Sequence, residues 1–148
     1  MALAVRSLSA PLHLLHRASQ RADGLFTRNV RAADLTPRQF TVLQAVAENN
    51  GLSQTDIMAA TGIDRSSTAE LVRRLVTNGC LQRRRKRQDA RVYAVRLTPL
   101  GLQKLGMAAP AARAAEDELL LPLPRAQRSA FLKALLLIAL GAGDPELQ

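Results

Sequence analysis

Two short helices joined by a tight turn are the feature that most restricts the fold of this chain. Ser53 fits the cap of the first helix, and Gly62 can adopt the left-handed conformation that ends it. Asp64 can then cap the second helix. Because only Ile63 separates Gly62 from Asp64, the second helix is set across the first and can protrude. This spacing predicts a helix-turn-helix.

The segment before this pair carries helix signals of its own. Thr36 and Gln39 fit a capping box, and Pro37 fits the first helical position, where its missing N–H costs nothing. Apolar residues at positions 40, 43 and 46 mark one buried face. A third helix is therefore expected directly before the helix-turn-helix, ending near residues 49–51.

After Gly79, which ends the second helix of the pair, the hydrophobic period changes from helical to alternating. Residues 81–83 and 92–97 read as β-strands, and the segment 84–91 between them is strongly basic. These features predict a β-hairpin with an exposed basic tip, which forms a wing beside the helix-turn-helix.

Three further helices are expected outside this region. The first begins just after Ser9 and runs to about residue 30. The second opens at Thr98 and Pro99, and Pro110 should kink or break it because a proline inside a helix removes a hydrogen bond. The last runs from Pro124 to Gly141 and is apolar nearly all round, so it predicts a subunit interface.

The expected fold class is mainly α with a small β-hairpin wing, a winged helix-turn-helix that dimerises through its N- and C-terminal helices. The 148 residues fit one domain. Residues 35–98 are expected to form the winged helix-turn-helix, while residues 1–34 and 99–148 are expected mainly to supply dimerisation helices. Only 3% of the residues are aromatic, so the core must use Leu, Val and Ala, which suits helix packing.

Positive charge is concentrated in the predicted helix-turn-helix and wing. The whole chain carries a net charge of +9, and residues 64–96 account for +7 of it. Nearly all these cations are Arg, whose planar fork matches phosphates and guanine edges. This distribution indicates a polyanion as the partner, and double-stranded DNA fits the predicted elements.

The candidate DNA-binding residues lie on the second helix of the pair and on the wing. The start of that helix is expected to enter the major groove, and its later arginines to contact phosphates. The wing arginines are expected to flank the duplex, where one can enter a narrow minor groove. The candidates are Arg65, Ser66, Ser67, Thr68, Arg73, Arg74, Arg84, Arg85, Arg87, Asp89 and Arg91.

Several function classes are disfavoured. The chain has no glycine-rich phosphate loop, no metal-ligand spacing and no paired nucleophile and base, so no enzyme, cofactor or metal site is expected. The single cysteine, Cys80, excludes an intrachain disulfide and suits a reducing compartment such as the cytoplasm. The longest apolar run, residues 134–140, is too short to span a membrane.

In this order and spacing, four stretches resemble the MarR family of winged-helix transcriptional regulators. The most specific is Asp89-Ala90-Arg91 followed by Leu97-Thr98-Pro99-Leu100-Gly101. The others are Leu35-Thr36-Pro37-Arg38-Gln39-Phe40 with Val42-Leu43, Leu52-Ser53-Gln54-Thr55-Asp56-Ile57, and Gly62-Ile63-Asp64-Arg65-Ser66-Ser67 through Leu75.

The resemblance implies an obligate dimer joined by its first and last helices, which binds a pseudo-palindromic operator and usually represses transcription. It also implies that Arg91 reaches the minor groove and that Asp89 orients an arginine. Many such proteins release DNA when an aromatic carboxylate or phenol enters a cleft between the dimer helices and the DNA-binding lobe. The chain departs from the family pattern at Ala69-Glu70, where a Thr or Ser followed by a basic residue is common.

Candidate effector-binding residues are His13, His16, Arg17 and Arg38, of which the two histidines share a face of the first helix. Two histidines alone are too few for a metal site. Two alternatives remain beside a ligand-responsive repressor. One is a non-specific architectural nucleic-acid-binding protein. The other is a redox-responsive regulator acting through Cys80, although a single cysteine at this position is also consistent with a small core residue.

Overall fold

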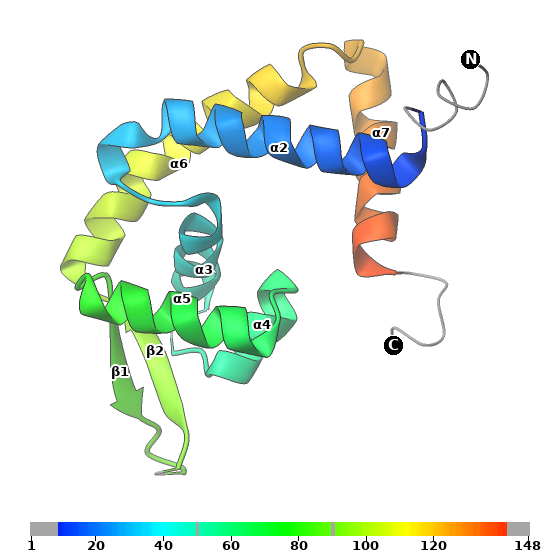
Figure 1. Ribbon diagram of the computed structural model, residues 1–148. Helices are drawn as coiled ribbons and strands as arrows, with labels where there is room; N and C mark the ends of the chain where they lie inside the picture. The colour runs from blue at the N-terminus through cyan, green and yellow to red at the C-terminus, as the bar shows by residue number, and fades with distance from the viewer. Residues whose placement is uncertain (1–8, 50, 90, 142–148) are drawn as a thin grey trace.

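The computed structural model describes residues 9–49, 51–89 and 91–141. Figure 1 shows α3, α4, α5 and the hairpin gathered in one lobe, with α2 and the later part of α6 above it and α7 at the far end of α2. The elements in chain order are α2 (Pro11–Asn29), η1 (Arg31–Ala33), α3 (Pro37–Glu48), α4 (Gln54–Thr61), α5 (Arg65–Thr77), β1 (Leu81–Arg85), β2 (Tyr93–Leu97), α6 (Pro99–Leu120) and α7 (Arg125–Leu140). The predicted mainly α fold, a helix-turn-helix with a small β-hairpin wing, is therefore confirmed, and dimerisation through the terminal helices stays a prediction.

The predicted caps form hydrogen bonds at the starts of α3 and α4. Thr36 Oγ1 accepts the backbone N–H of Gln39 at 3.2 Å, and Gln39 Oε1 accepts that of Thr36 at 3.0 Å. Ser53 and Asp56 make the same reciprocal pair at 3.1 and 2.9 Å. At the end of α4, Gly62 has a φ of 70° and so supplies the left-handed residue that the turn requires.

One apolar core holds together the lobe formed by α3, α4, α5 and the hairpin. Its buried residues come from α3, α4, α5 and both strands, so the helix-turn-helix and the hairpin share a single core. These are Val42, Leu43, Val46, Ile57, Val72, Leu75, Cys80, Leu81 and Val95, each exposed by no more than 3%.

The hairpin is antiparallel, with a register that runs from Leu81 opposite Leu97 to Arg85 opposite Tyr93. Val95 donates its N–H to the carbonyl of Leu52 at 2.7 Å, which ties β2 to the segment before α4. The prediction that Arg84 and Arg85 lie in the loop is wrong, because β1 continues through both residues. Their side chains point to opposite faces of the sheet, since direction alternates along a strand.

Pro110 does not break α6, which runs from Pro99 to Leu120 through it. The proline is exposed, whereas Ala108, Ala112 and Ala115 are buried on the same helix. Packing of that small-residue face against α2, η1 and α3 holds the helix together, and water can bind the backbone carbonyl that the proline leaves unpaired.

A second apolar cluster joins the upper helices to the lobe. Phe26 of α2 and Phe40 of α3 pack with ring centroids 5.4 Å apart, tilted by 54°. Val30, Ala108 and Ala112 complete this cluster together with Ala33. It joins α2 and α6 to α3, the first helix of the lobe.

The end of the molecule that contains α7 leaves much apolar surface uncovered. α7 has no buried residue, and Leu136 and Ile138 are 58% and 63% exposed. Leu12 and Leu14, at the start of α2, are also exposed. Exposed apolar surface of this extent is typical of a protein–protein interface. Across the described ranges, no helix is long and apolar enough to cross a membrane.

Candidate nucleic-acid interface

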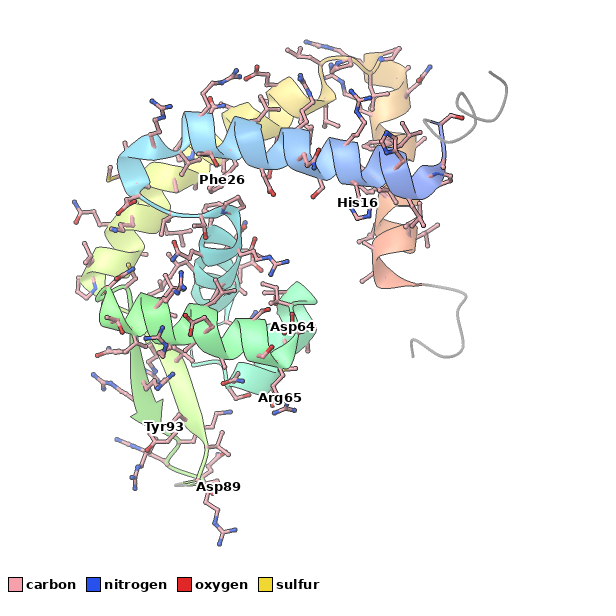
Figure 2. All side chains as sticks on the ribbon, in the orientation of Figure 1. His16, Phe26, Asp64, Arg65, Asp89 and Tyr93 are labelled. Carbon is pink, nitrogen blue, oxygen red and sulfur yellow. The ribbon has the colours of Figure 1, made fainter. Side chains whose placement is uncertain are left out.

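The start of α5 is held in place by Asp64. One oxygen of Asp64 accepts the backbone N–H of Ser67 at 2.9 Å and the hydroxyl of Ser66 at 3.0 Å. These hydrogen bonds from Ser67 and Ser66 lower the pKa of Asp64 to about 2, so the cap is charged at neutral pH. Arg65 is exposed, and Figure 2 shows it beside Asp64 at the junction of α4 and α5. The first turn of α5 is thus fixed, while the guanidinium of Arg65 stays accessible to a ligand.

Thr68 is not available for DNA contact, and its place among the predicted site residues is wrong. The side chain is fully buried, and its hydroxyl donates to the carbonyl of Ile63 at 3.2 Å. Because α5 has 3.6 residues per turn, Thr68 falls on the same face as the buried Val72 and Leu75 rather than beside Ser66. Its hydrogen bond instead stabilises the turn between α4 and α5.

Arg73 and Arg74 are exposed on α5, as predicted, but both are bound to Glu70. Glu70 accepts from Arg73 Nε and Nη2 at 2.9 and 2.8 Å, and from Arg74 Nε at 2.7 Å. The hydrogen bonds from Arg73, followed by those from Arg74, lower the pKa of Glu70 to about 2. The later part of the helix therefore presents two arginines that share one carboxylate.

Arg85 and Tyr93 contact each other across the wing, with the guanidinium 5.7 Å from the ring centroid. At the tip, Asp89 accepts the backbone N–H of Arg91 at 3.0 Å, so it shapes the turn through the backbone. Figure 2 shows Arg65, Tyr93 and Asp89 on the same side of the molecule, away from α2. Ala90, the middle of the motif at the tip, lies outside the described residues.

The other face of the hairpin carries a basic hollow of about 540 Å³, which the sequence analysis missed in part. Arg96 belongs to it with Arg84, Arg85, Lys86 and Arg87, and neither Lys86 nor Arg96 was among the predicted DNA-binding residues. Strand alternation was the available signal, because Arg96 lies two residues from Ala94, the partner of Arg84, on the same face. Arg83 was also missed, and it lies on the opposite face, near Val72 and Tyr93.

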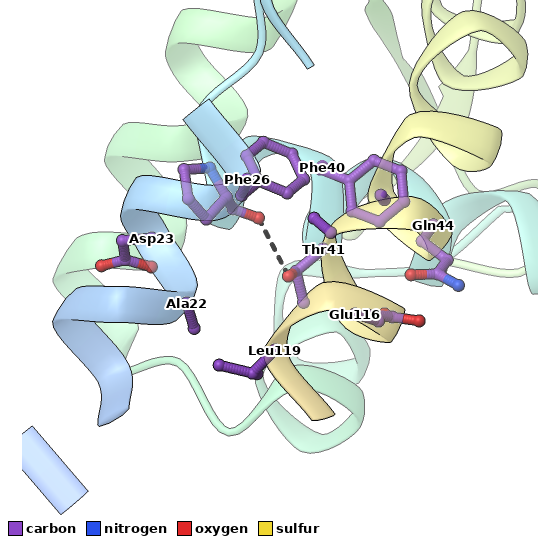
Figure 3. Close-up of a pocket in the computed structure, with 11 residues that line it drawn as sticks. Ala22, Asp23, Phe26, Phe40, Thr41, Gln44, Glu116 and Leu119 are labelled. Carbon is purple, nitrogen blue, oxygen red and sulfur yellow. Dashed lines mark hydrogen bonds between the residues drawn. The ribbon is translucent and has the colours of Figure 1, made fainter. Parts of the chain in front are cut away.

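A pocket of about 230 Å³ lies between α2, α3 and α6, where the upper helices meet the lobe. Phe26 and Phe40 form its apolar wall, while Asp23, Gln44 and Glu116 supply polar groups (Figure 3). Ala22, Pro37, Thr41, Ala112, Ala115 and Leu119 complete the lining. The pocket thus adjoins the cluster that connects the upper helices to the lobe.

Comparison with known proteins covers both the lobe and the whole chain. The MarR family model matches residues 33–92, which span the helix-turn-helix and most of the wing. The transcriptional repressor NicR of Pseudomonas putida is 32% identical over 68% of this chain. The chain spans less than two thirds of the length of the first curated relatives that it matches, 55% of one and 64% of NicR.

Solved structures match over nearly the full length. BpsR of Bordetella bronchiseptica, whose DNA binding is regulated by 6-hydroxynicotinic acid, superposes with a TM-score of 0.86 at 28% identity over 93% of this chain and 96% of its own. The repressor CouR, bound to a 23-mer DNA duplex, gives 0.83 at 32% identity over 90% of this chain and 95% of its own. The chain belongs to the MarR family.

MarR-family proteins are transcriptional regulators. The four residues predicted to bind an effector in this chain lie in different places. None of His13, His16, Arg17 and Arg38 lines the pocket between α2, α3 and α6. Arg38 instead lies in a groove with Ser67 and Arg74 of α5. Figure 2 shows His16 in the half of α2 towards α7. The structure does not bring the four together around the pocket.

Cys80 of this MarR-family chain is a core residue, 1% exposed. It packs with Leu75, Leu81 and Val95 where α5 meets the hairpin. Its burial denies an oxidant direct access, which supports the core interpretation over the redox one. Over the part of the chain that the structure describes, no group of three His, Cys, Asp or Glu residues is placed to hold a metal ion.

Proposed function

We propose that this protein is a sequence-specific, homodimeric DNA-binding repressor that an aromatic effector releases from a pseudo-palindromic operator. The observation that carries the proposal is the placement of the exposed Arg65, at the capped start of α5, on the same side of the molecule as the cationic hairpin. One duplex can then contact both, through its major groove and its adjacent backbone.

In this proposal, Arg65 and Ser66 read base edges in the major groove. Arg65 is exposed and can donate two hydrogen bonds to a guanine edge, and the partly buried Ser67 lies nearby in the first turn of α5. Arg73 and Arg74, two turns further along α5, contact backbone phosphates. Arg91 reaches the minor groove at the tip of the wing, as the resemblance to the MarR family implies.

The exposed apolar residues of α7 and of the start of α2 are proposed to form the dimer interface. Leu132, Leu136 and Leu140 recur at helical spacing along α7 and are 50–66% exposed. Covering them with a second copy removes an apolar patch that water disfavours. Two copies related by a two-fold axis would present two α5 helices to half-sites about one helical turn apart.

The pocket between α2, α3 and α6 is proposed to take the effector. Its volume of about 230 Å³ and its phenylalanine wall suit a molecule with one aromatic ring. Asp23, Gln44 and Glu116 can accept hydrogen bonds from a ring hydroxyl. Because BpsR responds to 6-hydroxynicotinic acid, hydroxylated aromatic compounds are the first class to consider. The carboxylate of an aromatic acid would have to point away from Asp23 and Glu116, since like charges repel. Binding there would favour a lobe spacing that misfits the operator.

The proposal is tested by measuring DNA binding with and without effector. Duplexes selected from a random-sequence pool are labelled, and release is followed by fluorescence anisotropy as hydroxybenzoic and hydroxynicotinic acids are added. We expect at least one acid to weaken operator binding while leaving weak binding to a scrambled duplex unchanged. A pool that yields no preferred sequence, or an operator complex that no aromatic acid weakens, would refute the repressor or the effector part respectively.

A further inference from the structure

Glu70 of α5 departs from the charge pattern of the surface around it. It is the only acidic residue within α5, whereas Arg65, Arg73 and Arg74 are basic. Its side chain is 45% exposed, and those of Arg73 and Arg74 are about 60% exposed, so water and a ligand can reach all three. A carboxylate on a surface built for a polyanion opposes binding unless it has a role there.

The geometry shows which donors Glu70 occupies. On Arg73 it takes Nε and Nη2, which form one of the two forks that a phosphate can use. On Arg74 it takes only Nε, at 2.7 Å, so both terminal amino groups stay free. Glu70 therefore competes with phosphate on Arg73, while it holds Arg74 in one orientation with four donor hydrogens available.

Glu70 also lies on the surface that approaches DNA in the proposed function. Together with Ser67 and Arg74 of α5, and Arg38 at the start of α3, it lines a groove of about 240 Å³. Ser67 belongs to the first turn of α5, one turn before Glu70. The carboxylate is thus about one helical turn from Ser66, which is proposed to read the operator.

We propose that Glu70 is a specificity-determining residue that lowers the affinity of α5 for DNA of any sequence and positions Arg74 for the operator. The inference rests on the proposed function. Sequence-independent binding depends almost wholly on phosphate contacts, so the loss of one net positive charge lowers its affinity with nothing to offset the loss. At the operator, the fixed orientation of Arg74 offsets part of that loss, so discrimination between operator and other DNA increases.

The test compares wild type with Glu70→Gln on the selected operator and on a scrambled duplex of equal length, over a salt series. The variant is expected to bind scrambled DNA about 3- to 10-fold more tightly at low salt, with a salt slope steeper by about 1. Its operator affinity should rise less, so the operator-to-scrambled ratio falls. Unchanged or weaker binding to scrambled DNA, or an unchanged ratio, would overturn the proposal.

Two matched variants identify the route of the effect. Asp117→Asn removes one exposed negative charge near the end of α6, and it should leave the ratio unchanged if position rather than net charge matters. In a chain that carries Arg73→Gln and Arg74→Gln, Glu70→Gln should alter the ratio by less than 2-fold, because the partners are gone. A full effect in that background, or an equal one from Asp117→Asn, contradicts the assigned role. A wild-type protein without operator preference would instead refute the proposed function, which the scrambled-duplex data alone do not test.

Discussion

Gly101 lies so close to Cys80 that a Cβ atom on residue 101 would be 2.1 Å from the Cys80 carbonyl oxygen. The same carbonyl accepts the N–H of Thr98 at 3.0 Å, and the Thr98 hydroxyl donates to the carbonyl of Gly79. The first turn of α6 is thereby held against the segment where α5 passes into β1. This contact explains a glycine inside a helix, where it costs conformational entropy.

Gly101→Ala is expected to destabilise the fold by at least about 2 kcal/mol, because the clash is with backbone that cannot move without displacing the hairpin. Chemical denaturation at fixed protein concentration measures the change. Gly106→Ala is the matched control on the same helix, since nothing lies within 4 Å of its added Cβ. It should raise stability by about 0.5–1 kcal/mol. Equal effects of the two substitutions would contradict the close contact.

Because Asp64 is charged, the stability of the fold is expected to depend on pH in the acid range. Its folded pKa is lowered to about 2, so its contribution is present above about pH 4 and is lost as the pH falls towards 2. Asp64→Asn keeps a capping side chain that does not titrate, so the Tm of that variant should fall less over this range. Asp64→Ala should lower the Tm at every pH. Parallel acid profiles for wild type and Asp64→Asn would refute the assignment.

Filling the pocket should separate effector response from DNA binding. Ala115 is buried and lines the pocket, so Ala115→Leu takes space that a ring would need. We expect effector affinity to fall at least about 10-fold, while operator affinity without effector stays within about 2-fold. Ala114→Leu, at an exposed position outside the lining, is the control. Calorimetric titration with the active acid measures effector affinity, and fluorescence anisotropy measures operator affinity. Normal effector binding by Ala115→Leu would exclude this pocket.

Burying a charge in the α7 surface should yield monomers. Leu136 is 58% exposed and sits in the apolar stretch proposed as the interface. Leu136→Glu is expected to weaken dimerisation by at least about 100-fold, because an unpaired carboxylate would be desolvated. Gln127→Glu adds the same charge at an exposed polar position of α7. Sedimentation equilibrium gives the constants, and a Leu136→Glu dimer as stable as wild type would rule out this face.

Local signals predicted most of the fold. Thr36, Ser53 and Asp64 cap the helices expected of them, and Gly62 and Gly79 adopt the positive φ needed at the helix ends. Each of these depends on neighbours within a few residues, so the sequence alone carries the information.

The outcomes that the sequence left open or predicted wrongly are those that tertiary packing decides. α6 continues through Pro110 because its buried alanine face holds the helix together. Thr68, which was predicted to contact DNA, is buried because it lies on the core face of α5. The pairing of Glu70 with two arginines and the contact between Gly101 and Cys80 depend on geometry that no short motif encodes. The candidate site was thus predicted by element, whereas the state of its individual side chains was not.

The most direct test of the account is the ratio of affinities for the selected operator and a scrambled duplex of equal length, measured by anisotropy over a salt series. Wild type is predicted to prefer the operator by at least about 10³-fold, with Arg65→Ala lowering that preference by about 1–3 kcal/mol. Equal binding to both duplexes, falling steeply with salt, would contradict sequence-specific recognition and leave phosphate binding alone.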